Sequence, residues 1–121
     1  MVKRGRVLLI DDEPFILELL ERILSDEYEV ATSTSSTDML ARLIAGERYD
    51  AILCDMLMPQ VTGMELHQAL VSYCPEQATR VVFVTGGATR DSHAAFLRSV
   101  SFVRKPFNVD RVREIVRALV G

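Results

Sequence analysis

The stretch Val7-Leu8-Leu9-Ile10-Asp11-Asp12 decides the fold, because an unbroken run of apolar residues stops abruptly at two carboxylates. A run that is apolar at successive positions is buried on both faces, as in the central strands of a parallel sheet covered by helices. The run Ala51-Ile52-Leu53-Cys54, which Asp55 follows, repeats this pattern further along the chain. The two runs together predict a parallel sheet whose strands end at polar groups.

Three more strands and five helices alternate with these runs. The strands are predicted at residues 28–32, 81–84 and 100–103, and the alternating pattern of the first of them indicates a more exposed strand. The helices are expected from Pro14, from a cap at Ser36 or Thr37, from a capping box at Thr62, over residues 90–98 and after Asn108. Five such β–α units predict an α/β fold with helices on both faces of a parallel sheet.

Composition and length narrow the class of protein. The 121 residues suit one domain, and 49% hydrophobic with 26% charged residues excludes a disordered or low-complexity chain. The net charge of −3 disfavours binding to a nucleic-acid backbone. Cys54 and Cys74 form no CxxC motif, which disfavours a zinc site or disulfide framework. No apolar run is long enough for a membrane span or a signal peptide, so we expect a cytoplasmic protein without membrane insertion.

Polar residues at the carboxyl ends of the strands form the candidate site. In an open parallel sheet ligands bind beyond these ends, where Asp11, Asp12 and Asp55 are expected to converge. Three uncompensated carboxylates repel one another, and an oxygen-only donor set favours a hard cation, above all Mg²⁺. Lys105 adds a positive charge suited to phosphate, and the hydroxyl of Thr85 is a donor for an anionic oxygen.

Each of these residues also has an ordinary structural interpretation. A single aspartate after a strand is most often a turn or cap residue, and Asp12 lies close enough to Pro14 to cap a helix. Lys105, taken alone, has the character of a surface lysine. The coincidence of polar groups at all four strand ends favours a functional site over four independent turns.

Four motifs, in order along the chain, resemble the receiver domain of two-component response regulators. They are VLLIDDEP at residues 7–14, ILCDMLMP at residues 52–59 with Gly63 beyond, VFVTG at residues 82–86 and FVRKPF at residues 102–107. The resemblance covers essentially the whole chain and implies one receiver domain over residues 1–121. It implies a (βα)5, flavodoxin-like sheet with strand order 2-1-3-4-5.

The resemblance also implies roles for the site residues. Asp55 would accept a phosphoryl group from a phosphohistidine, and Asp12 and Asp55 would bind Mg²⁺ together with the backbone carbonyl of Leu57. Asp11 would act through a metal-bound water. In this family the lysine that corresponds to Lys105 pairs with the phosphoryl group or the acceptor, and it typically precedes a cis proline.

The same family likeness implies a switch and partners. Thr85 would move toward the phosphoryl oxygens and Phe102 would change rotamer with it. The partner would be a histidine kinase or phosphotransfer domain that docks near Phe15 and Ile16. A homodimer through the fourth helix, fifth strand and fifth helix is a further expectation, whereas direct contact with nucleic acid is not expected. Such a domain promotes its own phosphorylation and dephosphorylation and has no separate substrate, so we do not class it as an enzyme.

Departures from the family pattern concentrate before the fifth strand. The segment between Thr85 and Lys105 is shorter than is common, Gly86-Gly87 follows Thr85, and Arg98-Ser99-Val100-Ser101 replaces the usual Gly-Ala turn. We therefore expect the fourth helix to be short, mobile or shifted. The pattern Val84-Thr85-Gly86-Gly87-Ala88, with Ala95-Phe96-Leu97 beyond it, resembles receivers attached to hybrid sensor histidine kinases.

Several sequence features disfavour other functions. An Mg²⁺-dependent aspartyl phosphatase or phosphotransferase typically has a second aspartate two positions after its nucleophile, where this chain has Leu57. A flavin or nucleotide binder would need a glycine-rich first loop, and a DNA-binding role would need an attached effector domain. We expect packing or surface roles, and no cofactor, for the remaining soft and titratable side chains: Cys54, Cys74, Met56, Met58, His67 and His93.

Overall fold

Five parallel strands form a single sheet in the computed structural model, which describes residues 3–86 and 95–121. The strand order is β2-β1-β3-β4-β5, and every neighbouring pair is parallel, as expected from the sequence. The strands are β1 (Arg6–Ile10), β2 (Glu29–Ser33), β3 (Ala51–Asp55), β4 (Val81–Thr85) and β5 (Phe102–Arg104).

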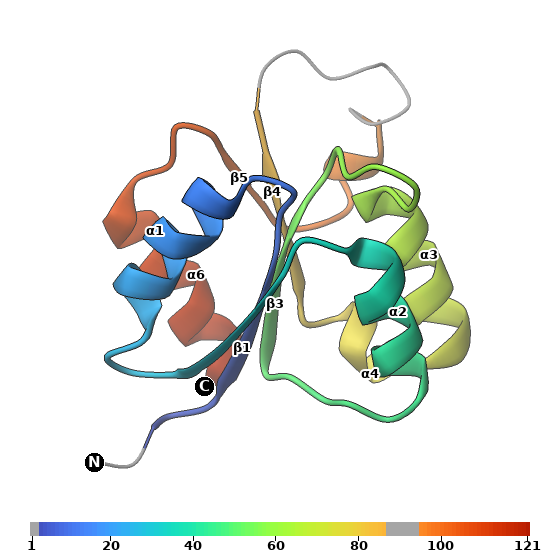
Figure 1. Ribbon diagram of the computed structural model, residues 1–121, viewed down its shortest axis with the longest axis horizontal. Coiled ribbons are helices and arrows are strands. Elements are labelled where there is room, and N and C mark those ends of the chain that lie inside the picture. The colour runs from blue at the N-terminus through green and yellow to red at the C-terminus, as the bar shows by residue number, and fades with distance from the viewer. Residues whose placement is uncertain (1–2, 87–94) are drawn as a thin grey trace.

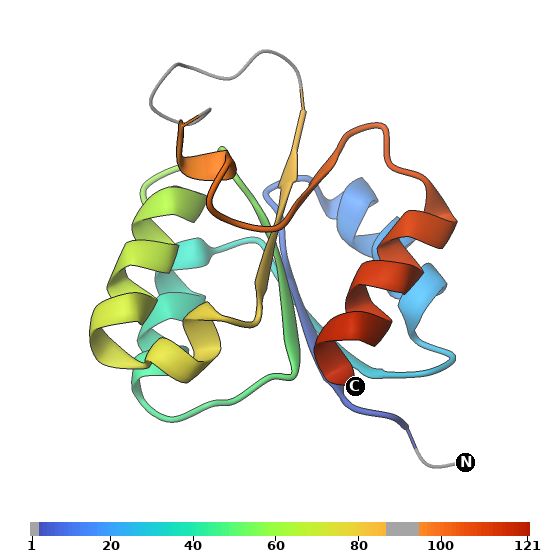
Figure 2. The same ribbon diagram turned by 180° about the vertical axis from the view of Figure 1, so that it is seen from behind.

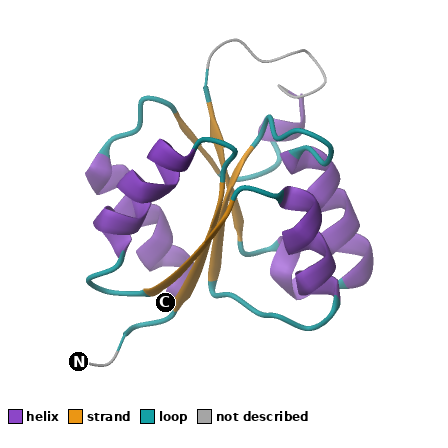
Figure 3. Cartoon of the chain, in the orientation of Figure 1, coloured by secondary structure: helices purple, strands orange, loops and turns teal. Residues whose placement is uncertain are grey.

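Helices cover both faces of this sheet, as Figure 1 and Figure 3 show. One face carries α1 (Pro14–Leu24) and α6 (Val109–Val120), and the other carries α2 (Ser36–Ile44), α3 (Gly63–Tyr73) and α4 (Pro75–Ala78). Two hydrophobic cores result, one on each side of the sheet. The three-layer arrangement confirms the predicted α/β fold.

Burial explains why the apolar runs were informative. Every residue of β3 and β4 is buried, because helices cover both faces of these central strands. β2 lies at the edge of the sheet, and its residues are exposed or only partly buried, as its alternating sequence predicted. Burying each large aliphatic side chain contributes about 1.5–3 kcal/mol, so the central strands anchor the fold.

The helix starts agree with the sequence at two of three predicted caps. Thr62 and Glu65 form the expected capping box at α3, and Asn108 caps α6. The cap of α2 was predicted one residue too late: Ser35, not Ser36 or Thr37, accepts the amide hydrogen of Asp38. Ser36 is instead buried and donates its hydroxyl to the carbonyl of Val61 at 2.6 Å, a tertiary contact that no local pattern could reveal.

The segment before β5 departs most from the predictions. β5 begins at Phe102, two residues later than predicted, because the pairing with β4 starts there and only the carbonyl of Ser101, among residues 99–101, bonds to β4. The helix expected over residues 90–98 falls partly outside the described residues, and residues 95–97 are helical. The short helix α4 was not predicted, although Pro75 occupies its first position. Within residues 3–86 and 95–121, no helix has the length and apolar character needed to cross a bilayer.

Candidate functional site: an acidic cluster with one lysine

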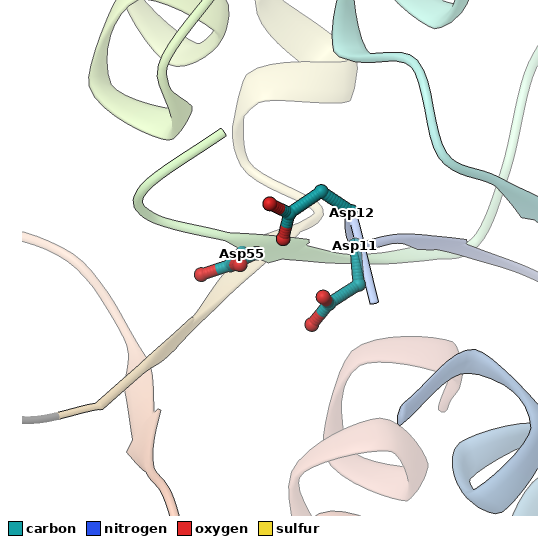
Figure 4. A group of neighbouring side chains, drawn as sticks. All are labelled: Asp11, Asp12 and Asp55. Carbon is teal, nitrogen blue, oxygen red and sulfur yellow. The ribbon is translucent and has the colours of Figure 1, made fainter. Parts of the chain in front are cut away.

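Three carboxylates meet at the carboxyl ends of β1 and β3, as Figure 4 shows. Asp11 and Asp12 follow β1 directly and Asp55 is the last residue of β3. The register pairs Ile10 with Cys54, so Asp11 and Asp55 occupy corresponding positions on adjacent strands. One carboxylate oxygen from each of the three lies within 4.8 Å of the others. The structure therefore brings together the acidic residues that the sequence singled out.

Local hydrogen bonds hold two of these carboxylates in place. The amide of Glu13 donates to Asp11 Oδ1 at 2.9 Å, and the amide of Leu57 donates to Asp55 Oδ1 at 3.3 Å. Asp11 and Asp55 are buried, whereas Asp12 is exposed. The donor at Leu57 was missed by sequence reasoning, because any residue there supplies a backbone amide.

Lys105 directly follows β5, which is two strands away from β3 in the sheet, and its side chain reaches the cluster. Its Nζ lies 3.2 Å from Asp11 Oδ2 and 3.8 Å from Asp55 Oδ2. Its backbone amide donates to the carbonyl of Thr85, and the peptide bond to Pro106 is cis, as the family resemblance implied. An ammonium group between two carboxylates can also bind an anionic oxygen that approaches from solvent.

The cluster is short of positive charge, and Asp55 shows this most clearly. Burial, with repulsion from Asp11, raises the pKa of Asp55 to about 6, although Lys105 and the Leu57 amide oppose the shift. For Lys105, burial lowers the pKa, but the attraction of Asp55 and Asp11 outweighs it and the net shift is upward. Three acids facing one base leave a net negative site that a cation would stabilise.

Thr85 is the last residue of β4, which lies next to β3, and Phe102 is the first residue of the neighbouring strand β5. Thr85 is 2% exposed, and among the described residues its Oγ1 has no hydrogen-bond partner. A buried hydroxyl without a partner is costly, so its orientation at the strand end suits an incoming acceptor oxygen. Phe102 is partly buried, and the guanidinium of Arg104 stacks over its ring at 5.4 Å. The Arg104 contact was not predicted.

The donor set fits the expected divalent cation. The three carboxylates offer only oxygen atoms, which Mg²⁺ prefers to nitrogen and sulfur, and their mutual distances allow one ion to contact all of them. Asp12 is the exposed member, so a cation can reach the cluster from solvent.

Other residues from the sequence analysis lie away from the cluster or pack in the cores. Phe15 is 73% exposed on α1, whereas Ile16 is half-buried. His67 packs edge-on against the rings of Phe83 and Phe96. Buried side chains without a role in the cluster are Cys54, Cys74, Met56 and Met58, and His93 lies outside the described residues.

Comparison with known proteins identifies the family. The model of the response regulator receiver domain matches residues 7–117. The chain belongs to this family. It is a receiver domain of two-component signalling systems, with the flavodoxin-like fold and the strand order that the family shares.

Individual relatives support the assignment. The response regulator protein PilR of Pseudomonas aeruginosa is 30% identical over 95% of this chain, which corresponds to 26% of PilR. This receiver thus spans about a quarter of the length of such curated relatives.

Solved structures of receiver domains have the same fold as this chain. A receiver domain protein from Clostridium thermocellum superposes with a TM-score of 0.82 at 27% identity, covering 96% of this chain and 94% of the other. The receiver domain of the sensor histidine kinase PA1611 from Pseudomonas aeruginosa, at 23% identity and a TM-score of 0.77, covers 97% of this chain and 98% of its own. That structure has a magnesium ion coordinated in its active-site cleft.

Proposed function

We propose that Asp55 is the phosphoryl acceptor of this receiver and that Asp11, Asp12 and Asp55 hold the Mg²⁺ it requires. The observation that carries the proposal is the convergence of three carboxylates and one ammonium group at the carboxyl edge of the sheet. Asp12 and Asp55 would bind the ion directly with the Leu57 carbonyl, and Asp11 would bind through water. A bound Mg²⁺ would supply the positive charge that offsets the charge of the transferring phosphoryl group.

The phosphodonor would be a phosphohistidine of a histidine kinase or phosphotransfer domain. A carboxylate oxygen of Asp55 attacks the phosphorus, a P–O bond forms, and the P–N bond breaks. The electron pair of that bond returns to the imidazole nitrogen of the partner. Lys105, already 3.8 Å from Asp55, would then pair with a phosphoryl oxygen, and Thr85 would donate its hydroxyl, which has no partner among the described residues, to another.

Docking would use α1, which borders the cluster. Phe15 is the most exposed large apolar side chain of the described residues, and it lines a shallow surface hollow of about 110 Å³ with Glu18, Leu19 and Arg22. An exposed aromatic ring next to a reactive carboxylate suits the apolar surface of a helical partner.

The functional unit would be a cytoplasmic receiver over residues 1–121 with no substrate other than its phosphodonor and water. It would pass the signal on through the surface near Phe102, and a homodimer through β5 and α6 would use the same surface.

Attachment to a hybrid histidine kinase, suggested by the Gly86-Gly87 segment, stays a prediction. The aspartyl phosphatase alternative gains nothing from the structure, since Leu57 is exposed where that chemistry needs an acid.

Acetyl phosphate labelling tests the proposal directly. With Mg²⁺ the protein should take up one phosphoryl group, and borohydride trapping with mass spectrometry should place it on Asp55. Asp55→Asn should lose the label, whereas Asp38→Asn, an exposed residue of α2, should keep it. Equal labelling of Asp55→Asn and the wild type would refute the proposal, as would labelling that is unaffected by removing Mg²⁺.

A further inference from the structure

A groove of about 470 Å³ lies far from the carboxylates, between α3, α4 and the segment that leads into β5. Figure 2 shows these elements beside β4. α3 contributes His67 and Val71, α4 contributes Pro75 and Ala78, and residues 99–101 form the opposite wall. Val81, at the amino end of β4, lies between the two walls. The volume is within the range of pockets that bind ligands.

Within residues 3–86 and 95–121, the backbone of β4 is unpaired at Val81 on the side that faces this groove. β5 pairs with β4 only from Phe83 to Thr85, and the last bond at this end runs from the Phe83 amide to the Ser101 carbonyl at 3.0 Å. Backbone groups two residues apart in a strand point to the same side, so the N–H and C=O of Val81 point the same way as those of Phe83. In the described part of the chain, no backbone bond joins Val81 to residues 99–101.

Among the described residues, the N–H and C=O of Val81 therefore have no backbone partner on the side where β5 would continue. This residue is only 5% exposed, and a buried amide group without a partner costs free energy. A donor and an acceptor on one strand residue are the pattern that an extended peptide satisfies when it joins a sheet edge.

The residues that line the groove determine whether a charged or an uncharged ligand fits it. In the part of the chain that the structure describes, nine residues line it, and none is aspartate, glutamate, lysine or arginine. Burial lowers the pKa of His67, which favours the neutral form of its imidazole. Val71, Ala78 and Val100 provide aliphatic walls, so charged ligands such as nucleic acids or phosphorylated peptides are poorly matched.

We propose that this groove binds an extended, uncharged peptide segment of a partner protein, which pairs with the free edge of β4 at Val81 and places an aliphatic side chain between Val71 and Ala78. The site is separate from the acidic cluster, and binding does not require phosphorylation. The receiver would thus have a second interaction surface, on the side of the sheet opposite to α1 and α6.

A short peptide provides the probe: acetyl-Thr-Val-Leu-Val-Thr-amide, added to the unphosphorylated protein and followed by amide NMR. Binding should shift the signals of Val81 and Val100 and slow hydrogen exchange of the Val81 amide about 10-fold, without a comparable change at Phe83. A peptide of the same sequence with N-methyl groups on its three central residues should bind about 10-fold more weakly, because it lacks the donors.

Two matched variants test the position of the site. Val71→Arg places a charge on the rim at a residue that is 52% exposed, and it should weaken binding about 10-fold or more. Ile44→Arg makes the same kind of change on α2 at a residue that is 44% exposed and does not line the groove, and it should bind as the wild type does. Far-UV circular dichroism checks that both variants are folded.

Three results would each overturn the proposal. The first is a Val81 amide that is as protected as that of Phe83 in the free protein, because the edge would then be closed. The second is equal affinity for the N-methylated peptide, because the groove would then bind side chains without strand pairing. The third is sedimentation that shows a dimer abolished by Val71→Arg, because a second copy of the chain would then be the occupant.

Discussion

Charged side chains are arranged differently at the amino and carboxyl ends of the strands. At the amino ends of the strands, charges are paired: Arg6 lies 3.8 Å from Glu29, Arg48 lies 3.1 Å from Glu76, and Arg117 lies 2.6 Å from Glu27. At the carboxyl ends, Asp11, Asp12 and Asp55 lie together, and among the described residues one ammonium group, that of Lys105, forms ion pairs with two of them, Asp11 and Asp55.

The two arrangements have different consequences for stability and for function. Ion pairs between solvent-exposed side chains contribute little to the free energy of unfolding, so replacing these residues should have little effect on stability. A largely buried cluster with unbalanced charge costs stability, which is typical of functional sites. Four predictions follow from this contrast, in order of decreasing effect.

The largest effect is expected for Asp55→Asn in the absence of Mg²⁺. The pKa of Asp55 is raised from 3.8 to about 6 on folding, so the folded state binds a proton more tightly than the unfolded state. The stabilisation is present below about pH 4 and is lost as the pH rises through about 6, in total about 3 kcal/mol. At pH 8 with EDTA, Asp55→Asn should therefore be about 2–3 kcal/mol more stable than the wild type.

Urea unfolding at pH 4 and pH 8 measures this difference. The gain in Asp55→Asn should shrink toward pH 4, where the wild-type carboxyl is already protonated. A gain that is equal at both pH values would show that desolvation and repulsion at Asp55 are not its cause.

A smaller effect is expected for Asp12→Asn. The variant removes one charged ligand but leaves the acceptor, so Mg²⁺ affinity should fall about 10-fold, or about 1.4 kcal/mol. Calorimetric titration of Mg²⁺ measures the change, with Asp26→Asn, an exposed residue outside the cluster, as control. Unchanged affinity in Asp12→Asn would place the metal elsewhere.

Thr85→Ala should change the response to a phosphoryl mimic more than it changes stability. The hydroxyl is buried without a partner among the described residues, so its loss should alter the unfolding free energy by less than about 1 kcal/mol. With beryllofluoride and Mg²⁺, the amide shifts around Phe102 should be reduced, because the donor that couples the site to this surface is absent. Shifts equal to those of the wild type would exclude Thr85 from the switch.

The smallest effect is expected at the amino ends. Arg117→Ala breaks the exposed pair with Glu27 and should lower the melting temperature only slightly, and less in high salt than in low salt. Labelling of Asp55 by acetyl phosphate should be unchanged. A large loss of stability would mean that the amino ends are not the electrostatically relaxed part of the molecule.

Much of the candidate site was predictable because its residues follow apolar strands. An aspartate after a buried strand marks a strand end, and parallel strands bring such ends to one edge. Asp11, Asp12, Asp55, Thr85 and Lys105 were all found in this way, and the structure places them together. Contacts that use backbone atoms, such as the Leu57 amide on Asp55, leave no trace in the sequence.

The predictions were weakest where contacts between distant residues outweigh local preference. Ser36 has the character of a helix cap but is drawn into a buried bond with the Val61 carbonyl, and Ser35 caps α2 instead. Val100 has strand character but lies outside β5, because the segment that leads into β5 bonds to β4 only from Ser101 onward.

The sequence by itself determined the parallel α/β architecture and the acidic and basic residues at the strand ends, because hydrophobic periodicity and residue type are local properties of the chain. Only the tertiary structure decided the raised pKa of Asp55 and, among the described residues, the missing partners of the Thr85 hydroxyl and of the Val81 backbone. These properties depend on burial and on distances between residues far apart in the chain, and both arise only when the sheet and its helices pack together.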